Sequence, residues 1–94
     1  MSYFDRQGNP QTFQQYVALR HSDPDYDVVA LTKLNDVDVS TLFFGAGITG
    51  PHYETMVLGG ALDLEAECCS TEAEALAGHA AWVEKVRASQ QVAS

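Results

Sequence analysis

The 94 residues, of which 46% are hydrophobic and 10% aromatic, predict a single folded domain over residues 1–94 with a modest core. Thirteen acidic against five basic residues give a formal net charge of −8, which repels a phosphate backbone and argues against direct nucleic-acid binding. The sequence has neither an apolar run of about 18 residues nor a basic start followed by an apolar core, so we expect no membrane span and no signal peptide.

The N-terminal third predicts an extended segment followed by a short helix. Residues Tyr3–Pro10 are typical of an extended piece that enters a turn. Thr12 and Gln15 have the spacing of a capping box, so a helix is expected directly after Thr12. Pro24 disfavours helical geometry before it, which ends the helix near Ser22. The apolar stripe is narrow, because the residues at helical spacing are only Phe13, Tyr16, Val17 and Arg20.

A first β-hairpin follows this helix. Residues 26–34 and 37–44 are rich in β-branched and aromatic side chains, and Asn35-Asp36 between them suits a two-residue turn. Because such a turn fixes the register, two pairs can be checked: Lys33 opposite Asp38, and Val29 opposite Leu42.

A second hairpin is predicted from residues 53–58 and 62–69, joined by a three-residue loop of Gly59, Gly60 and Ala61. Side-chain alternation then places Asp63, Glu65 and Glu67 together on one strand face. The opposite face would carry the apolar side chains Met56, Leu58, Leu62, Leu64, Ala66 and Cys68.

The C-terminal quarter predicts a longer helix, with Thr71 as N-cap and Glu74 as its capping-box partner. We expect residues 88–94 to be a frayed tail. The fold class is therefore α+β: a four-stranded antiparallel meander with a short N-terminal helix and a longer C-terminal helix packed on it. The apolar arc of the second helix would comprise Ala73, Leu76, Ala80, Val83 and Val86.

Two motifs suggest cofactors, but their context argues against them. Residues 45–50 match the glycine spacing of a dinucleotide-binding loop, yet Pro51 and a strand follow where a helix is required, so a flexible loop is expected. The adjacent Cys68 and Cys69 would point to opposite strand faces, with Cys69 outward, and could not converge on a metal with His79, His52 or His21. We therefore expect reduced thiols, no cofactor, no metal and no catalytic residue.

Five residues are candidates for partner binding. His79 is expected to be a partly buried histidine bonded to the sheet or to a tyrosine. The adjacent Gly78 would let the helix approach the sheet or a neighbouring chain closely. Trp82 lies at the edge of the helical arc, where an aromatic residue covers core or an interface. The acidic strand face is either a solvated surface or a surface for a basic partner. The candidates are thus Asp63, Glu65, Glu67, His79 and Trp82.

Four stretches resemble one family: the Tyr-Phe-Asp-Arg start at residues 3–10, Val-Ser-Thr at 39–41, Glu-Thr-Met-Val at 54–60 and Ser-Thr-Glu-x-Glu-Ala-Leu-x-Gly-His at 70–79. In these motifs the chain is similar to small proteins encoded by phages of mycobacteria and related actinobacteria. The family carries no known activity. The resemblance, together with the absence of a converged site and the acidic balance of the chain, predicts a phage-encoded accessory protein without enzymatic activity. We expect it to act in the host bacterial cytoplasm by binding either itself or a host protein.

Two alternatives and one further partner remain open at the level of sequence. A small ligand-binding or enzymatic module would have its pocket under the C-terminal helix, around His79, Trp82 and Tyr53. A minor structural protein of the virion would occur in purified particles. We also expect the chain to bind itself as a homodimer, because a sheet covered on one side leaves apolar side chains to be buried. Those side chains are Val29, Leu31, Leu42 and Phe44.

Overall fold

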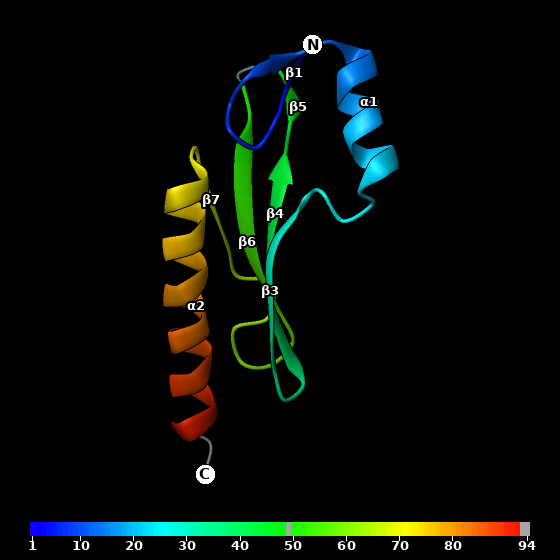
Figure 1. Ribbon diagram of the computed structural model, residues 1–94. Coiled ribbons are helices and arrows are strands. Elements are labelled where there is room, and N and C mark those ends of the chain that lie inside the picture. Colours follow the sequence, from blue (N-terminus) through cyan, green and yellow to red (C-terminus); the bar gives the residue numbers. More distant parts are fainter. Residues whose placement is uncertain (49, 93–94) are drawn as a thin grey trace.

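The computed structural model describes residues 1–48 and 50–92. Its centre is a four-stranded antiparallel sheet in the order β3-β4-β6-β7, with one long helix, α2 (Glu72–Val92), lying along one face (Figure 1). The strands are β3 (Val28–Leu34), β4 (Val37–Phe44), β6 (His52–Leu58) and β7 (Ala66–Cys69). The predicted α+β meander with a C-terminal helix packed on it is confirmed.

The first hairpin has the predicted turn and part of the predicted register. Asn35 adopts a left-handed φ of 59°, which asparagine tolerates better than most residues. Lys33 pairs with Asp38, and their side chains form an ion pair at 3.5 Å. The pairing of Val29 with Leu42 is wrong, because an irregularity between Val28 and Ala30 makes Val28 the partner of Leu42. The extra residue, Val29, instead packs against the cluster around Phe43 beneath α2.

The second hairpin has a wider turn than predicted. Seven residues, 59–65, separate β6 from β7, and Met56 pairs with Ala66. Gly59 and Gly60 both have positive φ, and the Asp63 carboxylate accepts the Gly59 N–H at 2.6 Å. The Asp63 side chain therefore stabilises the turn, and both Asp63 and Glu65 lie in the turn and not in β7. For this reason they do not share a strand face with Glu67. The predicted acidic strand face is wrong.

A small second sheet, in the order β2-β1-β5, joins the two ends of the N-terminal half. It contains β1 (Ser2–Phe4), β2 (Pro10–Gln11) and β5 (Ala46–Gly47). Residues 46–47 were predicted as a flexible loop, but they pair with β1; Thr49 lies outside the described residues. Helix α1 (Phe13–Ser22) has the predicted Thr12–Gln15 capping box and contacts β1 and β2, away from α2 (Figure 1).

Two apolar clusters fill the space between α2 and the sheet. One joins Val37, Val39 and Val57 to Trp82, Val83 and Val86, and the other joins Phe43 and Tyr53 to Ala75. The predicted burial of Val83 and Val86 is confirmed, whereas that of Ala73, Leu76 and Ala80 is wrong, because these three are exposed. The helix is rotated so that the polar tips of His79 and Trp82 reach partners on the sheet.

The C-terminal tail is more ordered than predicted. Helix α2 continues to Val92, and the Gln90 side-chain amide donates a 2.7 Å hydrogen bond to the Leu34 carbonyl. Frayed ends lack such anchors. The expectation of a frayed segment is therefore wrong for residues 88–92, and residues 93–94 lie outside the described part of the chain.

Candidate functional site

Polar side chains from three strands meet His79 beneath α2. Its Nδ1 lies 2.8 Å from Thr41 Oγ1, and its Nε2 lies 2.8 Å from Thr32 Oγ1. Thr41 Oγ1 also lies 2.6 Å from Thr55 Oγ1. His79 is only 7% exposed, and Thr41 is fully buried. These four residues form the His79 network, and the predicted buried histidine bonded to the sheet is confirmed.

The His79 network is suited to holding α2 in place. A neutral imidazole has one donor and one acceptor nitrogen, and each hydroxyl can donate and accept, so every polar atom of the network can be paired. Burial lowers the pKa of His79, which favours its neutral form. Both ring nitrogens are already bonded to threonine hydroxyls. A general base needs a nitrogen within reach of a substrate proton, and this arrangement offers none.

Trp82 closes the seam between α2 and β7. The indole N–H donates a 3.2 Å hydrogen bond to Glu67 Oε1, and the Lys85 ammonium lies 4.3 Å from the centre of the indole ring. Trp82 is 8% exposed and belongs to the core cluster. It therefore covers core, which is one of the two roles predicted for it. Glu67 lies on the face of β7 that α2 covers, beside the helix.

A hollow of about 190 Å³ lies between β7 and the first half of α2, lined by Glu67, Glu74, Cys69 and Gly78 among others. Gly78 was predicted to let the helix approach the sheet or a neighbouring chain closely. The close approach to the sheet is wrong, because a Cβ at this position would meet nothing within 4 Å in this chain, and the approach of a neighbouring chain stays a prediction. The helix is held off the sheet here, so the space beside Gly78 stays open.

The two cysteines occupy opposite faces of β7, as alternation predicts, but the faces are inverted. Cys69 pairs with Tyr53 and packs against the core cluster, whereas Cys68 is exposed and its thiol donates to Glu54 at 3.7 Å. The expectation that Cys69 points outward is therefore wrong. Burial raises the pKa of both thiols, with Glu54 adding to the effect at Cys68 and Glu74 at Cys69. Both remain protonated at neutral pH, which makes them weak nucleophiles.

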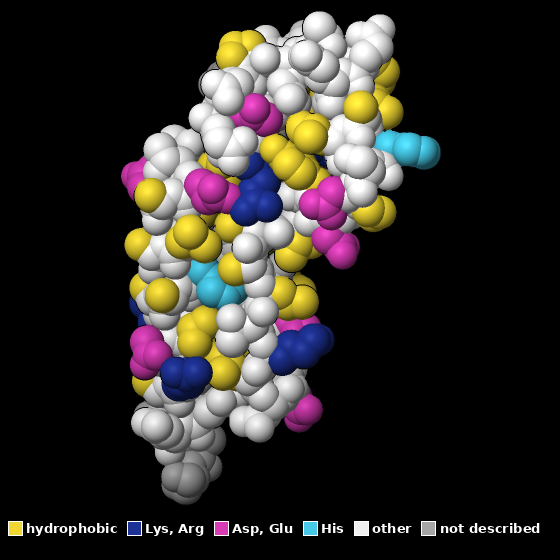
Figure 2. All heavy atoms as spheres, viewed as in Figure 1, with side chains coloured by type: hydrophobic (Ala, Val, Ile, Leu, Met, Phe, Trp, Pro, Cys, Tyr) yellow, Lys and Arg dark blue, Asp and Glu magenta, His cyan; other side chains and the backbone are white. Residues whose placement is uncertain are grey.

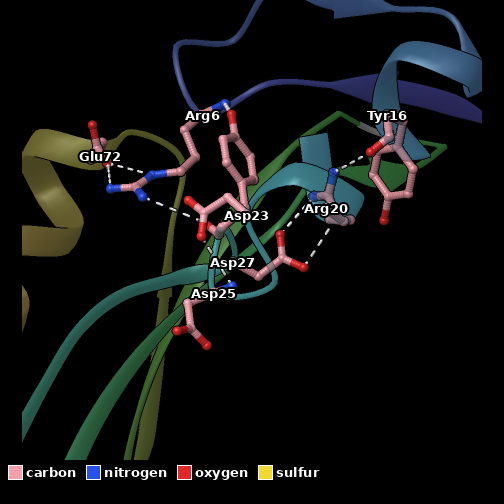
Figure 3. A network of polar contacts seen from close by, with 8 residues as sticks. Arg6, Tyr16, Arg20, Asp23, Asp25, Asp27 and Glu72 are labelled. Carbon is pink, nitrogen blue, oxygen red and sulfur yellow. Dashed lines mark hydrogen bonds and ion pairs between the residues drawn. The ribbon is translucent and has the colours of Figure 1, made fainter. Parts of the chain in front are cut away.

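Two arginines hold the N-terminal part of the chain in place (Figure 3). Arg6 forms an ion pair with Glu72 at the start of α2, and its carbonyl accepts a 2.6 Å hydrogen bond from the Tyr53 hydroxyl. Arg20 binds Asp27 with two nitrogens, at 2.6 and 3.1 Å, and lies 3.7 Å from the centre of the Tyr16 ring. Arg6 and Glu72 lie 66 residues apart in the sequence, whereas Arg20 and Asp27 lie only seven apart, and the sequence analysis predicted neither pair.

Each of the five Lys and Arg side chains contacts a neighbouring side chain. Four of the five lie in ion pairs, namely Arg6–Glu72, Arg20–Asp27, Lys33–Asp38 and Arg87–Glu84, and the fifth is the Lys85 that lies over Trp82. On the face of the molecule drawn in Figure 2, Lys and Arg side chains are bordered by Asp or Glu. Four of the thirteen acidic residues are paired in this way, and the other nine take part in no ion pair within residues 1–48 and 50–92.

The five candidate residues do not form one site. Asp63 supports the turn, Glu65 is exposed in the same turn, and Glu67 bonds Trp82 on the α2 side of β7. The His79 network is a separate, buried cluster. Its threonines were missed, although Thr41 and Thr55 alternate with valines on core-facing strand positions and could have been recognised as polar groups that need a partner.

The geometry defines a small α+β domain in which the buried His79 network helps to hold α2 on the sheet. Comparison with protein-family models, curated proteins and solved structures finds no match to this chain. The resemblance to actinobacterial phage proteins thus remains a prediction from the sequence motifs. Over the described residues, neither helix combines the length and the apolar character needed to cross a membrane.

Proposed function

We propose that this chain is a phage-encoded accessory protein that acts in the cytoplasm of the infected bacterium by binding a basic host protein, without catalysis. The observation that carries the proposal is the imbalance of charges in the described part of the chain. Nine carboxylates there lie in no ion pair, whereas four of the five cations do and the fifth, Lys85, lies over the Trp82 ring. A surface of this kind attracts basic partners over the range of the Debye length and repels nucleic acid.

The contact region that we propose is the acidic rim, which consists of Glu65, Glu67 and Glu74. All three side chains are exposed, and Glu67 and Glu74 line the same hollow between β7 and α2. A lysine or arginine of the partner could enter that hollow and meet two carboxylates there. Charged contacts at the edge of an interface act mainly on the association rate and on its salt dependence.

The competing proposal, a ligand-binding or enzymatic module under α2, has less support. It relies on His79, Trp82 and Tyr53, and each of these is at most 8% exposed. Their polar atoms bond to threonines, to Glu67 and to the Arg6 carbonyl respectively. Protein binding uses groups that are exposed, whereas catalysis here would first require the core to open.

Affinity capture from an actinobacterial lysate tests the proposal, with the captured partner then purified for kinetics. The double variant E65Q/E67Q removes two rim charges and keeps an oxygen that can accept from Trp82. The matched control D25N/D36N removes two charges from exposed turn residues outside the rim. We expect the rim variant to slow association and flatten its salt dependence more than the control does. Equal effects of the two variants would show that only net charge matters and would reject the rim.

A further inference from the structure

The sheet face that points away from α2 is a second surface that the proposed function does not use. Strand alternation and register place six large apolar side chains on it. This open face comprises Val28, Leu31, Leu42, Phe44, Met56 and Leu58. Four of them are exposed, with Leu31 at 51%, Leu58 at 42% and Val28 and Phe44 at 39% each, while Leu42 and Met56 are half-buried.

Within the described residues, neither helix packs on the open face. Helix α2 covers the opposite face, and α1 contacts β1 and β2. Tyr16 of α1 reaches only one end, where it lines a hollow of about 240 Å³ with Leu42 and Phe44. At the same end, the Phe44 ring stacks on His52 with 4.9 Å between the ring centres. A sheet with one apolar face in water is an incomplete two-layer structure.

The charge on the open face favours a second copy of this chain as its partner. Lys33 and Asp38 compensate each other by their ion pair, and Glu54 adds one negative charge, so the face carries about one of the eight net negative charges. Two such faces can therefore meet with little local repulsion. A basic host protein would find its complement elsewhere, on the acidic rim.

The size of the face also fits a weak self-association. The four strands contain 26 residues together, so at roughly 3.3 Å per residue and about 4.8 Å between strands they span roughly 410 Å² in projection. This matches the largest apolar patches on typical monomers and is roughly half of the 800 Å² that each partner contributes to a standard interface. Pairing through the sheet edges is disfavoured, because β3 carries Lys33 and an irregularity at Val29, and β7 has only four residues.

We propose that two copies of this chain associate through their open faces to form a two-layered β-sandwich with one α2 on each outer side. Since each copy also carries a net charge of −8, long-range repulsion opposes this contact and is reduced by salt. The dimer should therefore strengthen as salt is added, which is the opposite of what salt does to a complex with a basic partner.

Sedimentation equilibrium over a wide concentration range tests this proposal with L31E and its matched control L76E. Leu31 is 51% exposed on the open face and Leu76 is 49% exposed on α2, and both changes give the same net charge. We expect the average mass of the wild type to rise above the 10.2 kDa of the monomer, L76E to follow it, and L31E to require at least about tenfold higher concentration. L58E, at the other end of the face, should repeat the effect if L31E proves unfolded by circular dichroism.

Three results would overturn the proposal: a monomeric mass for the wild type at every concentration, association of folded L31E and L58E that equals that of L76E, or a dimer that salt dissociates. The experiment uses no host partner. Its failure would therefore leave the proposed binding of a basic protein untouched, and failure of the capture experiment would leave the dimer untouched.

Discussion

Replacing Thr41 with valine removes the central hydroxyl of the His79 network while keeping the shape of the side chain. Thr41 is fully buried, and its hydroxyl is the partner of both His79 Nδ1 and Thr55 Oγ1. Each buried polar group that is left unpaired costs about 1–3 kcal/mol, so we expect T41V to lower the free energy of unfolding by roughly 2–4 kcal/mol. For a domain of this size that corresponds to a fall in Tm of at least about 8 °C.

Urea unfolding followed by the fluorescence of the single tryptophan, Trp82, measures this loss at the α2 seam. S40A is the matched control, because Ser40 precedes Thr41 on β4 and points to the open face; its loss should stay within about 0.5 kcal/mol. The triple variant T41V/T55V/H79L removes the partners together and should recover part of the loss. The reasoning is refuted if T41V unfolds at the same urea concentration as S40A, or if the triple variant shows fully additive losses.

Three further predictions concern pH, glycines and thiols. Burial lowers the pKa of folded His79 below its ordinary value of 6.5, so between these two pKa values the unfolded chain binds more protons than the folded one. The contribution of His79 to the free energy of unfolding should therefore be full above pH 6.5. It should fall as the pH drops toward the folded pKa, by up to about 1.4 kcal/mol per pH unit. A titration of the urea midpoint should show this slope, and H79L should lose it while the exposed His21 and His52 remain. G45A should destabilise the fold by about 1–3 kcal/mol, because the added Cβ would lie 2.7 Å from the Phe4 carbonyl oxygen and from the Phe43 ring. G78A should stabilise it by up to about 1 kcal/mol, because the added Cβ lies in an open helical position and meets no atom. Thermal melts that rank the two variants the other way would contradict the packing at these glycines. Chelators and thiol-blocking reagents should leave the fold and partner binding intact, and C69S should shift Tm by only a few degrees, a result that metal release with unfolding would contradict.

Local signals in the sequence predicted the elements well, because their causes are local. The Thr12–Gln15 capping box and the Thr71 cap each join residues three apart, and the Asn35-Asp36 turn needs only a residue that tolerates positive φ. The strand order follows from the short connections between consecutive strands.

Features that depend on distant contacts could not be predicted. Leu64 has a φ of 68°, which leucine rarely adopts and which no sequence signal announces, and the turn that contains it shifted the acidic residues out of one face. The Thr41 and Thr32 partners of His79 lie 38 and 47 residues away, and they decide how α2 is rotated. The alternation of β7 was predicted, but not which of its faces α2 covers, so Glu67 and Cys69 were placed on the wrong side.

The central claim is that this acidic chain works by binding a basic protein through its rim. The most direct measurement is the association rate of the purified host partner with the wild type, E65Q/E67Q and D25N/D36N at low and high salt. We expect the rim variant to associate most slowly at low salt and the three rates to converge as salt screens the charges. Association of E65Q/E67Q at the wild-type rate under both conditions would contradict the claim.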